Sequence, residues 1–179
     1  MEQPVLSVRE ITAADVSPLI NYWLSATDEY LAGMGALRAK MPSRPEWEQI
    51  FADQLAAGYP DKKAYCIIWL VNGVAVGHSN VNKIVFGKEA YMHLHLWNAA
   101  QRSTGYGAQL VKLTIPYFFR NLQLETLYCE PYALNPAPNK TLPRAGFRLV
   151  KTYITTPGFL NFEQQVNLWE ISRRDVLGV

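Results

Sequence analysis

The sequence predicts a mixed α/β fold of the α+β kind, in which a mostly antiparallel sheet of six to seven strands carries helices on both faces. Three observations predict it. Short runs of alternating apolar residues, typical of strands, are interspersed with stretches whose apolar residues recur at helical spacing. The pair Asn72-Gly73 between two apolar runs is a strong hairpin signal. Strand-like and helix-like segments alternate in the second half, and the 179 residues suit one domain over 1–179.

The first third of the chain is expected to form one strand and then two helices. Leu6 to Ile11 alternates apolar and polar residues and predicts the strand. Thr12, with Asp15 three residues later, is a capping-box signal for the first helix. The second helix is expected to open at Ser43-Arg-Pro-Glu46, and the Gly, Pro and Ser residues of 33–45 predict a loop before it.

An antiparallel meander is expected next, and after it strands and helices alternate. Pro116 lies inside an expected helix and predicts that this helix is broken or bent. The expected strands are 64–71, 74–86, 91–97, 124–131, 147–155 and 162–172, and the expected helices are 108–119 and 136–145.

The composition excludes several classes of protein. With 49% hydrophobic and 18% charged residues the chain is too apolar for disorder, and without a Lys/Arg cluster nucleic acid is not an expected partner. No apolar run approaches the ~20 residues of a membrane span, and the first ten residues lack a signal-peptide pattern, so we expect a cytoplasmic protein without a membrane partner. Cys66 and Cys129 lack metal-site spacing and are expected to be buried free thiols.

The most informative segment runs from Tyr91 to Leu110, where a strand leads through a glycine-containing loop into a helix. Such a loop directs backbone N–H groups and the positive end of the helix dipole at one point, which suits a diphosphate. Glycines let the backbone approach the phosphates closely. The spacing matches neither a Walker loop, because Lys112 lies too far along, nor a dinucleotide fingerprint, whose third glycine is Leu110 here.

This segment resembles a known family. Arg102-Ser-Thr-Gly105-Tyr-Gly107 is similar to the Q/R-x-x-G-x-G/A signature of the GNAT superfamily of N-acetyltransferases. Residues 130–147 resemble the later motif of that superfamily, with Asn135 after a strand, a short helix and then Gly146-Phe147. The branch that acts on ribosomal-protein N-termini is closest in motif, and the order of elements agrees over roughly residues 6–172.

The resemblance implies a site for acetyl-coenzyme A as cosubstrate. In this superfamily the loop-bearing strand is splayed from the next one, so coenzyme A is expected between 91–97 and 124–131. Asn135 is expected to reach the pantetheine arm, and it also suits an N-cap before Pro136. The other residues that the resemblance assigns are His95, Leu96 and Trp97, through backbone groups near the pantetheine, and Arg102, Ser103, Thr104, Gly105, Tyr106, Gly107 and Ala108, through backbone N–H groups around the diphosphate.

An attacking amine needs a base at neutral pH, because lysine-like amines have a pKa near ~10.4. His93 and His95 share one face of their strand, and the usual histidine pKa near ~6.5 suits the role. The aralkylamine acetyltransferase branch carries a histidine pair on this strand whose second member corresponds to His93, our first choice. Glu130, at the end of the facing strand, is the other candidate, and His78 is assigned no role. Packing or solvent exposure would account for these side chains equally well.

The group that helps the thiolate to leave is open. Many relatives carry a tyrosine four residues before the Gly of the Gly-Phe pair, and Leu142 stands there instead. Tyr132 or the dipole of the helix that opens near Asn135 are the candidates to replace it. Two smaller departures are Ala99 and Pro138, where the family has proline and serine.

These observations predict an acetyl-CoA-dependent N-acetyltransferase, without a metal, that acts on a small-molecule or peptide amine by direct attack on the thioester. Leu142 keeps open a catalytically degenerate acyl-CoA-binding regulatory module of the same fold, and a nucleotide-binding domain with the same loop is a third reading. A homodimer is compatible with the sequence. Side chains that can line an aromatic acceptor pocket, or simply form core, are Trp23, Tyr30, Met34 and Trp47.

Overall fold

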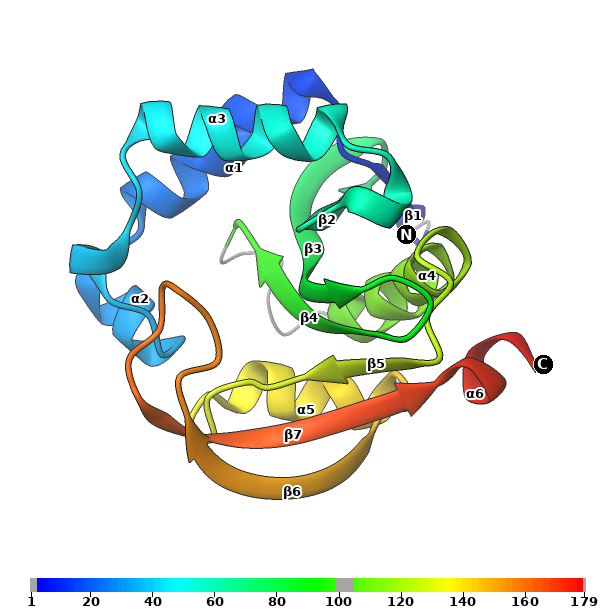
Figure 1. The fold of residues 1–179 in the computed structure, drawn as a ribbon. Helices are drawn as coiled ribbons and strands as arrows, with labels where there is room; N and C mark the ends of the chain where they lie inside the picture. The colour runs from blue at the N-terminus through cyan, green and yellow to red at the C-terminus, as the bar shows by residue number, and fades with distance from the viewer. Residues whose placement is uncertain (1–2, 99–104, 179) are drawn as a thin grey trace.

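The computed structural model describes residues 3–98 and 105–178, and Figure 1 shows their arrangement. In chain order the elements are β1 (Leu6–Glu10), α1 (Ala13–Ser25), α2 (Asp28–Gly33), the 3-10 helix η1 (Arg38–Lys40), α3 (Arg44–Ala56), the 3-10 helix η2 (Tyr59–Asp61), β2 (Tyr65–Val71), β3 (Val74–Val85), β4 (Glu89–Leu96), α4 (Tyr106–Asn121), β5 (Thr126–Cys129), α5 (Pro136–Arg144), β6 (Arg148–Thr155), β7 (Gln164–Ser172) and α6 (Arg173–Leu177).

One seven-stranded sheet forms the centre of the fold, in the order β1-β2-β3-β4-β5-β7-β6. Strands β4 and β5 run parallel, and every other pair of neighbours is antiparallel. The turn between β2 and β3 has Asn72 at φ 50° and Gly73 at φ 78°, both left-handed, as a tight two-residue hairpin turn requires. The prediction of a mixed, mostly antiparallel sheet is therefore confirmed.

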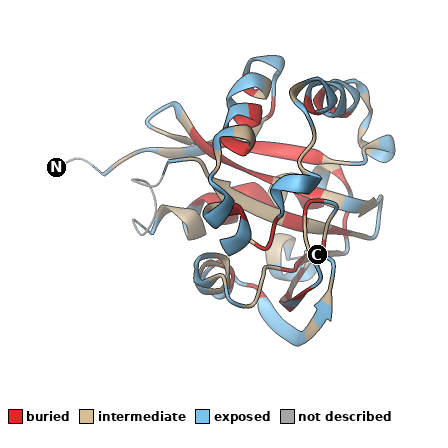
Figure 2. Cartoon of the chain, turned by 90° about the vertical axis from the view of Figure 1, so that its left-hand side faces the viewer, coloured by how far each residue is buried: buried red, intermediate tan, exposed pale blue. Residues whose placement is uncertain are grey.

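Helices cover both faces of this sheet, as expected. Successive residues of a strand point to opposite faces, so Ile67 and Trp69 of β2 belong to the core shared with α4, whereas Cys66 and Ile68 belong to the core shared with α1 and α3. Figure 2 shows the buried residues gathered on the strands and on the inner sides of the helices. Cys66 and Cys129 are buried free thiols, as the sequence predicts.

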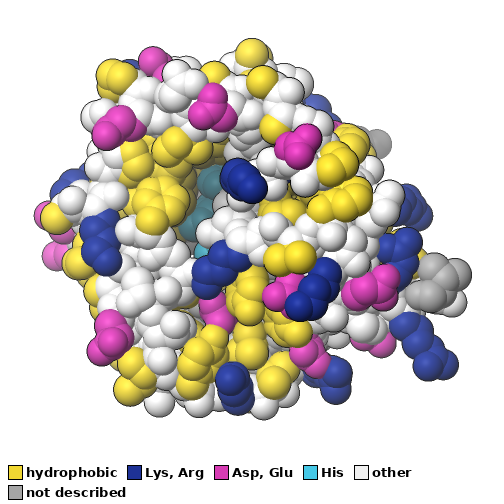
Figure 3. All heavy atoms as spheres, viewed as in Figure 1, with side chains coloured by type: hydrophobic (Ala, Val, Ile, Leu, Met, Phe, Trp, Pro, Cys, Tyr) yellow, Lys and Arg dark blue, Asp and Glu magenta, His cyan; other side chains and the backbone are white. Residues whose placement is uncertain are grey.

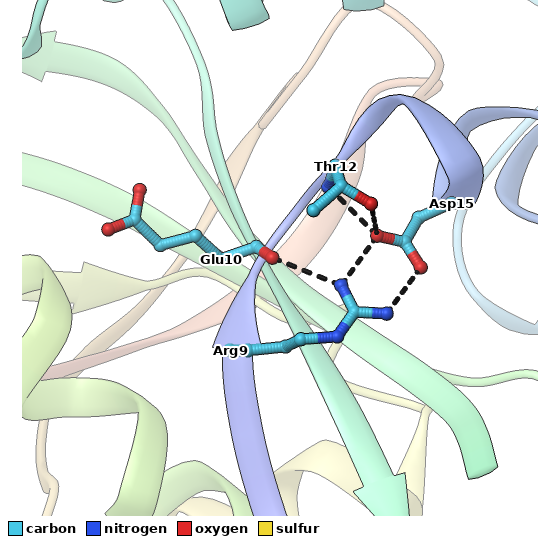
Figure 4. Close-up of polar contacts among 4 residues, drawn as sticks. All are labelled: Arg9, Glu10, Thr12 and Asp15. Atoms are coloured by element: carbon cyan, nitrogen blue, oxygen red, sulfur yellow. Dashed lines mark hydrogen bonds and ion pairs between the residues drawn. The ribbon is translucent and has the colours of Figure 1, made fainter. Parts of the chain in front are cut away.

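The junction between β1 and α1 is held by the predicted capping box. The Asp15 carboxylate accepts hydrogen bonds from the backbone N–H of Thr12 at 2.8 Å and from its hydroxyl at 2.9 Å (Figure 4). The Arg9 guanidinium donates to both carboxylate oxygens, at 2.6 and 2.8 Å. Burial alone raises the pKa of Asp15, but the hydrogen bonds from Arg9 and Thr12 outweigh it and hold the pKa below its usual value.

The structure differs from the sequence-based expectations at several elements. The short helices α2 and α6 were not predicted, and the expected loop 33–45 contains the 3-10 helix η1. Of the two outcomes expected at Pro116, a break or a bend, the break does not occur, since α4 continues to Asn121. Proline removes one helical hydrogen bond, but Ile115, Phe118 and Phe119 on either side of it are buried against the sheet, and their packing keeps the helix together.

Candidate active site

The site begins where β4 and β5 part. The two strands pair only at Glu89–Tyr91 of β4 and Thr126–Tyr128 of β5, and β5 ends at Cys129 while β4 continues to Leu96. Figure 1 shows the far ends of these two strands diverging. Residues 92–96 therefore pair with β3 on one side, and on the other side they extend beyond the pairing with β5, which is the splayed pair that the resemblance implies.

A cavity of about 740 Å³ lies at this divergence, between the N-terminal ends of α4 and α5. The first-turn N–H groups of a helix have no partner inside the helix, and both dipoles present their positive ends here. Lys140 and Arg144 add positive charge to the wall, against one carboxylate, that of Glu29, among the described residues that line it. The predicted coenzyme residues that line the cavity are His95, Leu96, Gly105, Gly107, Ala108 and Asn135.

Two glycines shape the start of α4. Gly105 is its N-cap and has φ 83°, a left-handed conformation that side chains rarely adopt. A Cβ atom at Gly107 would meet no described atom closer than the Thr141 side chain at 3.8 Å, so the backbone at this position is open toward the cavity. Both glycines expose backbone to the cavity, as the diphosphate interpretation requires.

Several predicted coenzyme residues need separate comment. Arg102, Ser103, Thr104 and Ala99 lie outside the described residues. The Trp97 backbone N–H already donates to the Val76 carbonyl at 2.9 Å, and this residue does not line the cavity. Asn135 caps α5, because its side-chain oxygen accepts from the Ala137 N–H at 3.3 Å, and it lines the cavity as well.

A second cavity, of about 160 Å³, lies between the sheet and helices α1 and α3. Trp23 and Trp47 stack with centroids 6.2 Å apart, and Phe159 approaches Trp47 at 6.1 Å. Trp23, Met34 and Trp47 line this aromatic cavity, whereas Tyr30 lines the cavity at the helix N-termini instead. Figure 3 shows histidine side chains at the bottom of a hollow beside hydrophobic side chains.

His93 and His95 stand on β4 between the two cavities. Both line the aromatic cavity, and His95 also lines the cavity at the helix N-termini. The His93 Nε2–H donates to Asn82 Oδ1 at 3.1 Å, which leaves Nδ1 as the basic nitrogen. Burial, and then the positive charge of Lys83, lowers the pKa of His93 to about 4. The expectation of a histidine with its usual pKa is therefore wrong for this side chain.

The second histidine belongs to a network that sequence reasoning missed. His95 Nδ1 lies 3.1 Å from the Tyr22 hydroxyl, and its ring stacks on His78 at 4.8 Å. The Trp97 indole N–H donates to His78 Nδ1 at 2.8 Å. Burial and then the neighbouring histidines lower the pKa of His95 well below its usual value, and burial lowers that of His78 to about 3. Pairing counted back from the Gly87 turn would have missed this contact, because a register shift between Asn82 and Val85 is what brings His78 opposite His95.

Glu130 lies close to these histidines but both of its oxygens have partners. Lys83 Nζ lies 3.4 Å from Oε2, and the Tyr153 hydroxyl donates to Oε1. A third, small cavity of about 70 Å³ brings Glu130, Tyr132, His93 and His95 together. The three residues predicted to take part in catalysis, His93, Glu130 and Tyr132, thus meet at one place.

Leu142 and Tyr132 occupy different surroundings. Leu142 is fully buried in the core beneath α4, so it serves packing. Tyr132 lines the small cavity, and its ring packs edge-to-face against Phe162 with centroids 5.7 Å apart. A phenol hydroxyl is available next to the histidines even though the residue at position 142 has none.

Comparison with known proteins assigns this geometry to a family. The model of the acetyltransferase (GNAT) domain matches residues 6–148, most of the chain. The chain belongs to the GNAT acetyltransferases. A search of curated proteins finds no match to the GNAT chain. Among the described residues there is no group of three or more His, Cys, Asp or Glu side chains that could hold a metal ion, and no helix in them is long and apolar enough to cross a membrane.

Three solved structures of GNAT enzymes are similar in fold. Spermidine N-acetyltransferase from Vibrio cholerae, in complex with coenzyme A and spermine, has a TM-score of 0.74 and 16% identity over 96% of this chain and 98% of that one. Aminoglycoside acetyltransferase AAC(6')-Ib, with coenzyme A and kanamycin, has a TM-score of 0.73 and 14% identity over 98% of this chain and 99% of that one. RimL, a ribosomal L7/L12 alpha-N-protein acetyltransferase in complex with coenzyme A, has a TM-score of 0.74 and 17% identity over 96% of this chain and 95% of that one. At these identities the likeness establishes the fold.

The cosubstrate of the GNAT family, acetyl-coenzyme A, fits the residues present. Two helix N-termini, an open glycine backbone and two cationic side chains suit a phosphorylated ligand, and they converge on the cavity of about 740 Å³. The cavity reaches Leu94, His95 and Leu96, in the part of β4 that extends beyond its pairing with β5, and the β4 backbone there would bond the pantetheine arm.

Proposed function

We propose that the protein transfers the acetyl group of acetyl-coenzyme A to the primary amine of a small molecule or peptide, by direct attack of the amine on the thioester. One observation carries the proposal. His93 and His95 stand where β4 leaves β5, with the coenzyme-sized cavity on one side and an aromatic cavity on the other. A donor and an acceptor bound in the two cavities would meet at these histidines.

The chain's own groups would hold the donor from three directions. Backbone N–H groups of Gly105, Tyr106, Gly107 and Ala108 at the start of α4 would bind the diphosphate, and the backbone of β4 beyond Met92 would bind the pantetheine arm. Asn135 at the start of α5 lines the same wall. When bound, the coenzyme supplies an acetyl group activated as a thioester.

Among the candidate bases, His93 is favoured on electrostatic grounds. Its Nδ1 is left free to accept a proton by the bond that Nε2–H makes to Asn82. His95 has its Nδ1 beside the Tyr22 hydroxyl, and its two histidine neighbours depress its pKa further. Glu130 has a partner on each oxygen. His93 is therefore the group best able to take a proton from the attacking amine.

The departing thiolate needs less help than the amine. A free thiol has a pKa near ~8.5, so its anion is accessible at neutral pH. Tyr132 lines the small cavity with His93 and can donate its phenolic proton, and the α5 N-terminus adds a favourable dipole. Either contribution would take over the role of the tyrosine that many relatives carry where this chain has Leu142.

A thiol-release assay with acetyl-coenzyme A and a panel of amines tests the proposal. The expected result is amine-dependent release of coenzyme A with acetylation of the amine. Coenzyme binding by calorimetry without release for any amine would instead support a binding module, the reading that Leu142 keeps open. Displacement of coenzyme A by adenine nucleotides at equal concentration would contradict the pantetheine site.

A further inference from the structure

The walls of the aromatic cavity define what kind of acceptor it can hold. The cavity is about 160 Å³, close to the ~150 Å³ apolar cavity that is known to hold a benzene molecule. Trp23, Trp47 and Phe51 form a stacked series along α1 and α3, and Phe159 closes it from the loop after β6. This space has the size and the lining for one six-membered aromatic ring.

No formal charge faces this ring-sized space. None of the described residues that line it is Asp, Glu, Lys or Arg, and its three histidines are held neutral by burial. In Figure 3 a Lys or Arg side chain stands beside the hollow. A polycationic acceptor would leave water without a carboxylate to pair with among the described residues that line this cavity, so the cavity disfavours polyamines and aminoglycosides.

Two buried polar atoms in the wall lack a partner. Trp47 Nε1–H, a donor, and Gln54 Oε1, an acceptor, make no hydrogen bond, and both residues are about 94% buried, with 6% exposed. They lie seven residues apart on α3, so both face the same side of the helix, and both line the cavity. Buried polar atoms are nearly always paired in native proteins. This donor and this acceptor point to a ligand group that supplies the missing bonds.

We propose that the acceptor is a primary amine carrying one aromatic ring with a neutral polar substituent, as in a phenolic arylalkylamine. This inference rests on the proposed function. The ring would occupy the cavity beside Trp23, Trp47 and Phe159, which line it. The hydroxyl of the substituent would accept a hydrogen bond from Trp47 Nε1–H, donate one to Gln54 Oε1, or do both. The amine at the other end of the molecule extends toward His93 and His95, which line the same cavity.

The test compares tyramine, phenethylamine and spermidine as acceptors in the thiol-release assay. We expect kcat/KM for tyramine to exceed that for phenethylamine at least tenfold, which is ~1.4 kcal/mol, because the hydroxyl restores bonds that phenethylamine leaves unmade. Spermidine should be poorer still. In Gln54→Leu and in Trp47→Phe, which keeps the ring, the preference for tyramine should fall below threefold. Gln49→Leu, on the exposed side of α3, is the matched control and should keep the wild-type preference.

Binding of para-ethylphenol, which has no amine, separates this inference from the proposed function. Quenching of tryptophan fluorescence should report millimolar or tighter binding by the wild type, weakened at least fivefold in Gln54→Leu. Acetylation of spermidine or a peptide in preference to tyramine, without phenol binding, would overturn the inference and leave the proposed function standing. Phenol binding without thiol release from any amine would do the reverse. Thermal denaturation of each variant checks that the fold is retained.

Discussion

Replacement of His93 by alanine should lower kcat/KM at every pH without changing the shape of the pH profile. Burial holds the pKa of His93 at about 4, so at pH 7 roughly 99.9% of the side chain is already the neutral base. Raising the pH further cannot create more of it. The acceptor amine, with a pKa near ~10, titrates instead, and kcat/KM should rise about tenfold per pH unit from pH 6 to pH 9.

The size of the loss follows from the role of the side chain. A positioned general base contributes roughly 10²–10⁴-fold, or ~3–5 kcal/mol of transition-state stabilisation. A plot of log kcat/KM against pH for His93→Ala should therefore run parallel to the wild-type plot, with values at least a hundredfold lower. The affinity of the variant for coenzyme A should stay within threefold of wild type. Initial rates of thiol release, measured at fixed ionic strength from pH 5 to pH 9, give kcat/KM for both proteins.

Two further variants separate chemistry from packing. His93→Gln retains an N–H that can donate to Asn82 but has no basic nitrogen, so it should be as slow as His93→Ala. Added imidazole should restore part of the rate to the alanine variant, in which space has been made, and not to the glutamine variant. A wild-type break near pH 6.5 that disappears in His93→Ala would refute the buried, neutral histidine. A rate within threefold of wild type throughout would pass the role of base to His95, Glu130 or a water.

Three other predictions concern the coenzyme site, the leaving group and stability. Gly105→Val and Gly107→Val should abolish coenzyme A binding in calorimetry, whereas Gly73→Val, which places valine at a similar left-handed φ of 78°, should leave affinity unchanged although it costs ~1–2 kcal/mol of stability. Tyr132→Phe should lower kcat by no more than about tenfold, ~1.4 kcal/mol, and a loss as large as that of the base variant would make thiolate departure the harder step. Asp15→Asn should lower the free energy of unfolding by roughly 1–3 kcal/mol at pH 7. Because the folded-state pKa of Asp15 is depressed, that difference should be fully present above ~4, the pKa of an aspartate in the unfolded chain, and should shrink only as the pH falls below this value through the lower folded-state pKa. A difference already lost between pH 7 and pH 5 would contradict the ion-paired carboxylate.

The parts of the fold that the sequence predicted are those with local signals. The capping box at Thr12, the helix start at Ser43 and the turn at Asn72-Gly73 each depend on residues within a few positions of one another, and all three are present. Helix α2, which is capped by Thr27, has only six residues. Fewer than two helical turns are too short to show a recurring spacing of apolar residues, so this helix was not predicted. Strand β5 stops at Cys129, earlier than expected, and Pro131 beyond it has no N–H to add to a ladder.

The candidate site divides in the same way. The glycines of the α4 loop and the cap at Asn135 were found because motif and geometry coincide in one stretch of chain. The Tyr22–His95 contact joins residues 73 positions apart, and the unpaired Gln54 oxygen is significant only because α3 packs over the sheet. Such features follow from tertiary packing, which the spacing of apolar residues along a helix or strand does not reveal. The altered pKa of His93 belongs to this class too, since burial sets it.

Removal of the site from water has two effects, one on the histidines and one on the acceptor amine. The burial that lowers the pKa of His93 and His95 also penalises an ammonium ion, and the Lys83 charge that lowers the pKa of His93 repels one, so an amine that enters beside them is bound more readily in its neutral form. A base with a pKa of about 4 could not remove a proton from a fully solvated ammonium ion without a cost of roughly 8 kcal/mol, since the two pKa values differ by ~6 units. It need only accept the proton that the amine loses as its nitrogen bonds to the acetyl carbon, when that proton has become acidic. The weak base and the neutral cavity are therefore matched to each other, and substituting a carboxylate into the aromatic wall should favour cationic acceptors while making deprotonation harder.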